Sequence, residues 1–224
     1  MVKKSSSSKS KKSQTRRWPV DAQVEVEVFV VGSPGIGRYT WIWKWGYNQN
    51  LPEFIRNQVA NRFQHLPTRK IEIDSDRVSV TVLYNLYFEI KDEGILPRYL
   101  LDEFNVYIFC FSVADRASFR TAERYWERLK LEHPSGFVTV LVGLKADLRT
   151  DPDTLAALEE RNEKVISPEE GQRLASKMGT KYFECSAINF EGIHEPISEV
   201  VSLALATNKV KAINTGKDGC CSII

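Results

Sequence analysis

Long apolar segments are missing from this chain of 224 residues. No run approaches the roughly 20 consecutive apolar residues that a membrane-spanning helix needs. The basic, polar N-terminus is not followed by the apolar stretch of a secretion signal. We therefore expect neither a spanning helix nor a signal peptide. Histidine is scarce as well, and His65, His133 and His194 are scattered without metal-ligating or catalytic spacing.

Cysteine is limited to four residues, which excludes a disulfide-rich framework. Cys110 and Cys185 lie in apolar, strand-like runs, so we predict buried free thiols. Cys220 and Cys221 are adjacent near the C-terminus, a spacing that suits neither a disulfide framework nor a zinc site. This usage predicts a reducing, cytosolic compartment.

Acidic residues are absent from positions 1–20, which carry seven lysines and arginines and a block of serines at 5–8. The rest of the chain holds 24 basic and 29 acidic residues, so the net charge of +2 hides an acidic body and a strongly basic tail. The tail has too little apolar content to form a core, and we predict that it is disordered.

Strand-like and helix-like patterns alternate from Val24 onward. Apolar, β-rich runs occupy 24–31, 77–84, 105–113, 137–143 and 181–186, and helical spacing is found at 118–132, 167–179 and 191–206. The second of these helices has Ser167 and Glu170 as a capping box and Gly179 as a stop signal. Such alternation predicts an α/β domain with a mostly parallel sheet.

Two further helical patterns lie near the N-terminal strand. Trp41 and Trp45 are i, i+4 neighbours, which favours core packing for both, whereas Trp43 would point elsewhere and is expected at the surface. Residues 51–66 place apolar residues at steps of three and four, which predicts an amphipathic helix packed on the core.

A glycine-rich stretch, "GSPGIGRYT", follows the first strand. It has the frame of a phosphate-binding loop, with two glycines five positions apart and then a basic residue. The basic residue is an arginine where such loops use lysine, and a tyrosine stands where they carry Ser or Thr. Alone, these residues are equally compatible with a tight strand–helix turn. The candidate phosphate-binding residues are Gly32, Ser33, Pro34, Gly35, Ile36, Gly37, Arg38, Tyr39 and Thr40.

Two downstream segments indicate guanine recognition. "LKADL" (144–148) ends an apolar strand and resembles the guanine-reading motif of small GTPases, in which a carboxylate accepts from the two N–H donors on the guanine edge and the lysine stem packs along the ring. "CSAI" (185–188) resembles the loop whose backbone N–H meets the guanine carbonyl. In this order and at this separation the two segments are far more specific than either alone. The candidate base-binding residues are Lys145, Asp147, Leu148, Ser186, Ala187 and Ile188.

The chain resembles the Rho family of small GTPases. "VYIFCFSVADRASF" (106–119) is similar to its fourth strand and the following turn, and 148–187 is similar to its helical insert and the elements after it. The match is strong over roughly 100–206, partial over 24–45 and poor over 46–99. The resemblance implies a P-loop NTPase-like small G domain at 21–206, an insert at about 150–165, a C-terminal hypervariable tail at 207–224, GTP or GDP as ligand, and effector or regulator proteins as partners.

The phosphate–magnesium half of the family pattern is altered. Where the family has Asp-x-x-Gly and then a water-orienting glutamine, this chain has Leu86, Glu89 and Ile90. Leucine cannot bind a metal, and Glu89 would repel the γ-phosphate. Thr40 and Thr68 remain as weak candidates for Mg²⁺ binding, and we name no catalytic residue. We expect hydrolysis to be lost.

The C-terminal "CCSII" resembles a prenylation box, preceded by three lysines between 209 and 217. Cys221 would carry the isoprenoid, a geranylgeranyl group given the terminal isoleucine, and Cys220 could be palmitoylated. The N-terminal basic tail would supply the second signal that firm anchoring needs. A solvating arm or a nucleic-acid patch is the alternative for that tail. We prefer the cytoplasmic face of the plasma membrane and expect no nucleic acid.

Three hypotheses follow for the activity. In the first, the protein binds GTP or GDP with little dependence on Mg²⁺ and negligible hydrolysis. In the second, it is a nucleotide-free pseudo-GTPase that acts as an interaction scaffold. In the third, it is a slow GTPase whose switch uses Thr40, Thr68 or Asp92, the last from a shifted "KDEG" loop at 91–94. We rank them in that order.

Overall fold

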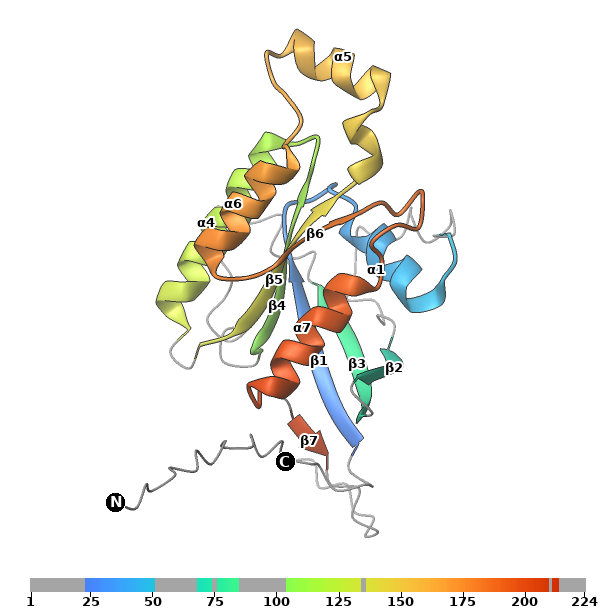
Figure 1. The fold of residues 1–224 in the computed structure, drawn as a ribbon, viewed down its shortest axis with the longest axis vertical. Coiled ribbons are helices and arrows are strands. Elements are labelled where there is room, and N and C mark those ends of the chain that lie inside the picture. Colours follow the sequence, from blue (N-terminus) through green and yellow to red (C-terminus); the bar gives the residue numbers. More distant parts are fainter. Residues whose placement is uncertain are drawn as a thin grey trace, which may run out of the picture.

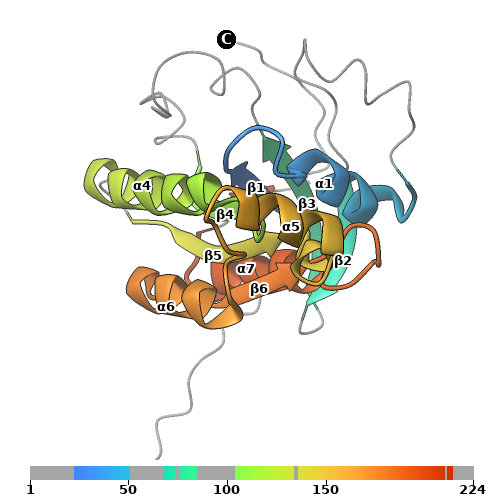
Figure 2. The same cartoon turned by 90° about the horizontal axis from the view of Figure 1, so that it is seen from above.

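The computed structural model describes residues 23–50, 68–73, 76–84, 104–133, 136–209 and 211–213. These residues form one mostly parallel sheet with helices on both faces (Figures 1 and 2), which confirms the α/β class. The described elements are β1 (Gln23–Val31), α1 (Arg38–Tyr47), β2 (Thr68–Ile73), β3 (Asp76–Tyr84), β4 (Val106–Ser112), α4 (Arg116–Glu132), β5 (Val138–Leu144), the 3₁₀ helix η2 (Ala146–Arg149), α5 (Pro152–Glu160), α6 (Pro168–Met178), β6 (Tyr182–Cys185), α7 (Glu195–Ala206) and β7 (Lys211–Ile213).

The order of the strands in the sheet is β2-β3-β1-β4-β5-β6, and β7 pairs with β1. Strands β3, β1, β4, β5 and β6 are parallel, whereas β2 runs antiparallel to β3 and β7 antiparallel to β1. The carboxyl ends of the parallel strands therefore share one end of the sheet. In open α/β sheets this end is where ligands bind.

Each face of the sheet has its own hydrophobic core, because successive side chains of a strand point to opposite faces. All seven residues of β4 are buried. Ile108 belongs to the core shared with α1 and α7, and its neighbour Phe109 to the core shared with α4 and α6. Trp41 and Trp45 are 0% and 1% exposed in the first core, as expected for the buried side of α1.

The three helices expected downstream are present. α6 begins after the predicted capping box of Ser167 and Glu170 and ends at Gly179, whose φ is 71°. α4 begins two residues before the predicted helix and is capped by the side chain of Asp115. The helix expected at 191–206 is present but begins at Glu195, with Pro196 in its first turn. Glu191 pairs with Ser186 in an isolated bridge, and residues 192–194 form a bend.

Helix α5, in the segment expected to be a helical insert, stands beyond the end of the sheet in Figure 1 and buries one of its residues, Leu158. The residues of β7 lie in the segment expected to be the C-terminal tail, yet their backbone pairs with β1 in the register Val24 to Ala212. In the described part of the chain, no helix combines the length and the apolar character required to span a membrane. The predicted helix 51–66 and the basic segment 1–20 lie outside the described residues.

Candidate functional site

The glycine loop joins the carboxyl end of β1 to the N-terminus of α1. Gly35 and Gly37 have positive φ angles of 73° and 99°, a conformation that other residues rarely adopt. Gly32 also requires the absence of a side chain, because a Cβ atom there would lie 2.5 Å from the carbonyl oxygen of Cys110. Gly37 is the N-cap of α1, so the loop leads directly into a helix N-terminus that has no acidic residue in its first turn.

The glycine loop is anchored to the protein interior by two of its other residues, Ile36 and Arg38. Ile36 is 2% exposed in the core shared with α1 and α7, Ser33 is half-buried and Pro34 is exposed. Arg38 is 7% exposed, and its Nη1 lies 3.5 Å from the carbonyl oxygen of Val30 at the end of β1. The cation of the motif is therefore directed inward, against the backbone of the central strand.

Tyr39 is part of an aromatic row along α1. Its ring centroid lies 6.1 Å from that of Trp43, which in turn lies 4.3 Å from that of Tyr47. Trp43 is half-buried, so the expected surface position is only partly met. Burial, followed by the neighbouring Tyr47, raises the pKa of Tyr39. Thr40 is half-buried at the next position.

Lys145 connects the base-recognition motif to the glycine loop. It follows β5 in the left-handed conformation (φ 58°), and its Nζ donates to the carbonyl oxygen of Gly35 at 2.8 Å. Its stem lies against Gly37, where an added Cβ would be 3.3 Å from the lysine Cε. Two motifs that are 110 residues apart are thus joined at the carboxyl end of the sheet.

Asp147 and Ser186 meet at the same end of the sheet. Ser186 is fully buried after β6, and its Oγ donates to Oδ1 of Asp147 at 2.6 Å and accepts from the backbone N–H of Asn189 at 3.1 Å. This contact fixes the orientation of the aspartate carboxylate. Leu148 and Ala187 are half-buried beside these residues, and Ile188 is 72% exposed.

A second connection between these segments was not expected from the sequence. Arg149 and Glu184 form an ion pair in which Nη2 lies 2.8 Å from Oε1, and Arg149 Nη1 also contacts Oε2. Burial opposes the charge of Arg149, but its hydrogen bond and attraction to Glu184 prevail, and the pKa of Arg149 is raised. The sequence offered one signal for this ion pair: a basic residue two positions after Asp147 and an acidic residue two positions before Ser186.

The weak magnesium candidate Thr68 is separated from the glycine loop in the described residues. Thr68 lies on β2 and its Oγ1 is hydrogen-bonded to that of Thr81 at 3.0 Å. Among the described residues, no three His, Cys, Asp or Glu side chains form a cluster that could hold a metal ion. Tyr39, which occupies the hydroxyl position of such loops, has its ring in the aromatic row with Trp43. Other positions named from the sequence lie outside the described residues: Leu86, Glu89, Ile90, Asp92, Cys220 and Cys221.

Comparison with known proteins places the chain among small GTPases. A profile of the Ras family matches residues 27–206. The chain is 34% identical over 162 residues to the GTP-binding protein RHO1 of Candida albicans, an alignment that spans 72% of this chain and 76% of that protein. It is 35% identical over 162 residues to the GTP-binding protein rho1 of Schizosaccharomyces pombe, spanning 72% of this chain and 75% of that one. The GTP-binding protein RHO1 of Saccharomyces cerevisiae is 30% identical over 168 residues, or 75% of each chain.

These matches agree with the strand order and with the meeting of the glycine loop, the Lys145 segment and the Ser186 segment at one end of the sheet. The sheet is that of a P-loop NTPase-like small G domain. The chain belongs to the Ras family and, within it, to the Rho-type small GTPases.

Proposed function

We propose that this protein binds GTP or GDP at the carboxyl end of its sheet, hydrolyses GTP inefficiently, and signals from a membrane through effector or regulator proteins. The observation that carries the proposal is the pair of contacts Lys145–Gly35 and Ser186–Asp147, which bring three separate sequence motifs to one end of the sheet. Its relatives RHO1 of Candida albicans and rho1 of Schizosaccharomyces pombe are named as GTP-binding proteins.

The base would be held by the residues that follow β5 and β6. The carboxylate of Asp147 is an acceptor for the two N–H donors on the guanine edge, and Ser186 already fixes its orientation through Oδ1. The stem of Lys145 lies at the level of Gly37 and would cover one face of the ring. The backbone N–H of Ala187 would meet the guanine carbonyl.

The phosphates would be held by backbone rather than by side chains. The loop from Gly32 to Gly37 leads into the N-terminus of α1, where free N–H groups and the helix dipole favour anions. Arg38 adds a positive charge near the end of β1 without offering the compact ammonium of a lysine. This arrangement supports binding of a nucleotide more than it supports neutralisation of charge during phosphoryl transfer.

The proposed loss of hydrolysis depends on three sequence positions and one contact. Leu86, Glu89 and Ile90 replace the metal-binding aspartate, the glycine and the water-orienting glutamine of the family. Tyr39 replaces the hydroxyl residue of the loop, and its ring lies in the row with Trp43. Without a positioned water and a neutralising metal, phosphoryl transfer loses most of its catalysis.

A nucleotide-free scaffold is the second candidate, and the inward position of Arg38 favours it. The side chain of Arg38 is 7% exposed and its guanidinium lies beside the Val30 carbonyl, so it would have to leave this position to contact a phosphate. The slow GTPase stays third, because Thr68 is already paired with Thr81 and Thr40 lies one residue beyond the usual hydroxyl position.

Nucleotide content of the purified protein distinguishes these candidates. The protein is denatured, its supernatant is separated by ion-exchange chromatography, and the measurement is repeated after treatment with EDTA. Near-stoichiometric GTP that survives EDTA is expected. Bound GDP would favour the slow GTPase, and the absence of nucleotide, with no binding of added GTP or GDP, would support the scaffold.

A matched pair of variants tests the proposed base site. Asp147→Ala removes the acceptor for guanine and is expected to abolish retention of nucleotide. Asp153→Ala removes an exposed acid in the first turn of α5 and is expected to leave retention unchanged. Equal retention by both variants would refute guanine recognition by Asp147.

The membrane part of the proposal depends on Cys221, with Cys220 and the basic segment 1–20 as supporting signals. We propose that the plasma membrane is the site of action. Intact-mass measurement of protein from eukaryotic cells is expected to show one isoprenoid, which Cys221→Ser removes. Co-sedimentation with vesicles containing phosphatidylserine is expected to fall in that variant and in a variant lacking residues 2–17. Unchanged sedimentation of both would exclude this anchor.

A further inference from the structure

The ion pair between Arg149 and Glu184 connects the two segments that carry the base-recognition residues. Arg149 is the last residue of η2, two positions after Asp147, and Glu184 lies on β6, two positions before Ser186. The contact between Ser186 and Asp147 joins the same two segments at 2.6 Å. The relative position of the aspartate and the serine is therefore set by two side-chain links, in addition to the pairing of β5 with β6.

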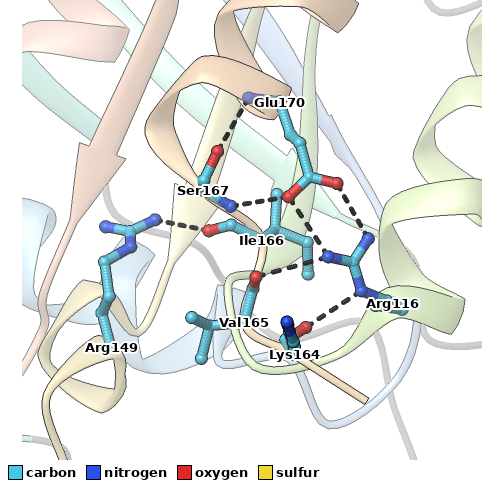
Figure 3. A network of polar contacts seen from close by, with 7 residues as sticks. All are labelled: Arg116, Arg149, Lys164, Val165, Ile166, Ser167 and Glu170. Atoms are coloured by element: carbon cyan, nitrogen blue, oxygen red, sulfur yellow. Dashed lines mark hydrogen bonds and ion pairs between the residues drawn. The ribbon is translucent and has the colours of Figure 1, made fainter. Parts of the chain in front are cut away.

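Arg149 is itself held by a third element. Its Nη2 donates to the carbonyl oxygen of Ile166 at 2.8 Å, in the segment between α5 and α6 (Figure 3). The side chains of Arg149 and Glu184 are 21% and 24% exposed, so the pair is partly shielded from water and from salt. A planar guanidinium can serve two carboxylate oxygens and a carbonyl oxygen at once, which the single ammonium of a lysine cannot match in geometry.

Glu184 is also fixed on its other side. Tyr182 donates its hydroxyl to Oε1 of Glu184 at 2.7 Å. The tyrosine ring occupies the space left by two glycines, since a Cβ at Gly143 would lie 2.5 Å from its hydroxyl oxygen and a Cβ at Gly171 would collide with the ring. The carboxylate therefore cannot follow a displaced arginine without disturbing the packing between β5, β6 and α6.

A comparable ion pair is present on the opposite side of the same segment. Arg116 of α4 contacts Glu170 of α6, with Nη1 to Oε1 at 2.9 Å and side chains 29% and 25% exposed. It also donates to the carbonyl oxygens of Lys164 and Val165 (Figure 3). None of these residues belongs to the base-recognition segments, so this pair provides a natural control of similar chemistry and burial.

We propose that Arg149 is a positioning residue for guanine recognition: through Glu184 it sets the separation between Asp147 and Ser186, and with it the selectivity for the guanine edge. The proposal rests on the proposed nucleotide binding. Loss of the ion pair removes one of the two side-chain links that add to the β5–β6 pairing, so the carboxylate of Asp147 can shift relative to the base. Displacement of a supporting contact of this kind weakens binding even though the contacting residues are intact.

The test compares dissociation of a fluorescent GDP and a fluorescent inosine diphosphate from the folded protein. Inosine lacks the exocyclic amino group, one of the two donors that Asp147 would read. Arg149→Met is expected to increase GDP dissociation by about 10-fold or more and inosine diphosphate dissociation by less, so the selectivity ratio falls. Arg149→Lys is expected to recover part of the ratio. Arg116→Met is the control. We expect it to lower thermal stability as much as Arg149→Met does, while its rate of GDP dissociation stays within about 2-fold of that of the unmodified protein.

The outcomes separate this inference from the function on which it rests. Equal effects of Arg149→Met and Arg116→Met on dissociation, or a loss of thermal stability with an unchanged selectivity ratio, would overturn the positioning role while nucleotide binding stands. Absence of binding by the unmodified protein would overturn both. If Arg149→Met does not fold, Glu184→Gln tests the same link from β6 with a side chain of the same shape, and an unchanged ratio in that variant is equally decisive.

Discussion

Lys145 Nζ lies 2.8 Å from the carbonyl oxygen of Gly35, so the base-recognition motif holds the tip of the glycine loop directly. The phosphate half and the base half of the candidate site are thus mechanically joined. A change in one half is expected to reach the other through this contact. The altered residues Arg38 and Tyr39 lie within the same loop and α1, a few positions from Gly35.

Removing the Lys145 ammonium is expected to accelerate nucleotide release. Lys145→Met keeps an apolar stem beside Gly37 and loses the hydrogen bond to Gly35, which is a charge-assisted contact. We expect dissociation of a fluorescent GDP to increase by about 10-fold. Lys181→Met is the control, because Lys181 is 65% exposed and pairs with Glu199 away from the loop. A rate unchanged in both variants would show that the contact does not hold the loop in the bound state.

Two glycines of the loop are expected to respond differently to alanine. Gly32→Ala places a Cβ 2.5 Å from the backbone oxygen of Cys110, which cannot move aside, so we expect a cost of at least about 2 kcal/mol and loss of nucleotide binding. In Gly35→Ala the added Cβ has no atom within 4 Å. The positive φ of 73° is the remaining source of strain, and we expect it to lower the free energy of unfolding by about 1 kcal/mol. Urea unfolding measures both, and equal costs would contradict the close approach of the loop to β4.

The strands and capped helices could be predicted because their signals are local. The apolar run of β4 and the capping box of α6 each indicate their element from residues within it or directly beside it. The predicted start of α7 at residue 191 precedes the observed one for a tertiary reason. Gly192 has a φ of 63° and approaches the carbonyl of Glu184 too closely for any side chain, so the chain turns back on β6 before the helix begins.

The remaining misses depend on pairing between distant residues. β2 is an edge strand whose residues alternate between exposed and half-buried, with charges in "TRKIEI", and it exists because it pairs with β3. The bond between Arg149 and Glu184 joins residues 35 positions apart. Composition and spacing identify both charges but do not show that β5 and β6 are neighbours, which is what places them together.

Glu170 is expected to stabilise the fold in a pH-dependent way. The hydrogen bonds from Arg116 and from the backbone N–H of Ser167 lower the pKa of Glu170. A lowered pKa in the folded state gives stability that is present above the unfolded pKa of about 4.3 and lost as pH falls through the folded pKa. Glu170→Gln is therefore expected to cost about 1 kcal/mol at neutral pH, given side chains that remain a quarter exposed.

Urea unfolding of both proteins at neutral pH and near pH 4 checks this prediction, and the difference between them should shrink at the lower pH. Glu132→Gln serves as the control, since its i, i+4 pair with Arg128 is more exposed and should be worth less than about 0.5 kcal/mol. A difference that grows on acidification would show that Glu170 is not held as a carboxylate.

The thiol of Cys110 is expected to be inert in the folded protein. Burial raises its pKa to about 12, against the opposing effect of the Arg38 guanidinium, and the side chain is 0% exposed on β4. The thiolate is the reactive form of cysteine. Alkylation by iodoacetamide at mildly alkaline pH, read by mass spectrometry of the peptide that contains Cys110, should therefore be slow in the native protein and rapid after unfolding. Comparable rates in both states would show that β4 opens readily.

The same raised pKa predicts a loss of stability at alkaline pH. Because the folded pKa of about 12 lies above the unfolded value of about 8.5, the contribution of Cys110 is complete below pH 8.5 and is lost as pH rises through the folded pKa. In Cys110→Ala this titration is absent, so its unfolding free energy should fall less steeply than that of the unmodified protein between about pH 9 and 11. Burial and then the neighbouring Cys110 also raise the pKa of Cys185, so the comparison is made in a Cys185→Ala background, where this second thiol is absent from both proteins. Parallel stability curves for the two proteins would assign the alkaline transition to other groups and would place the Cys110 thiol in a wetter environment than the core of β4 provides.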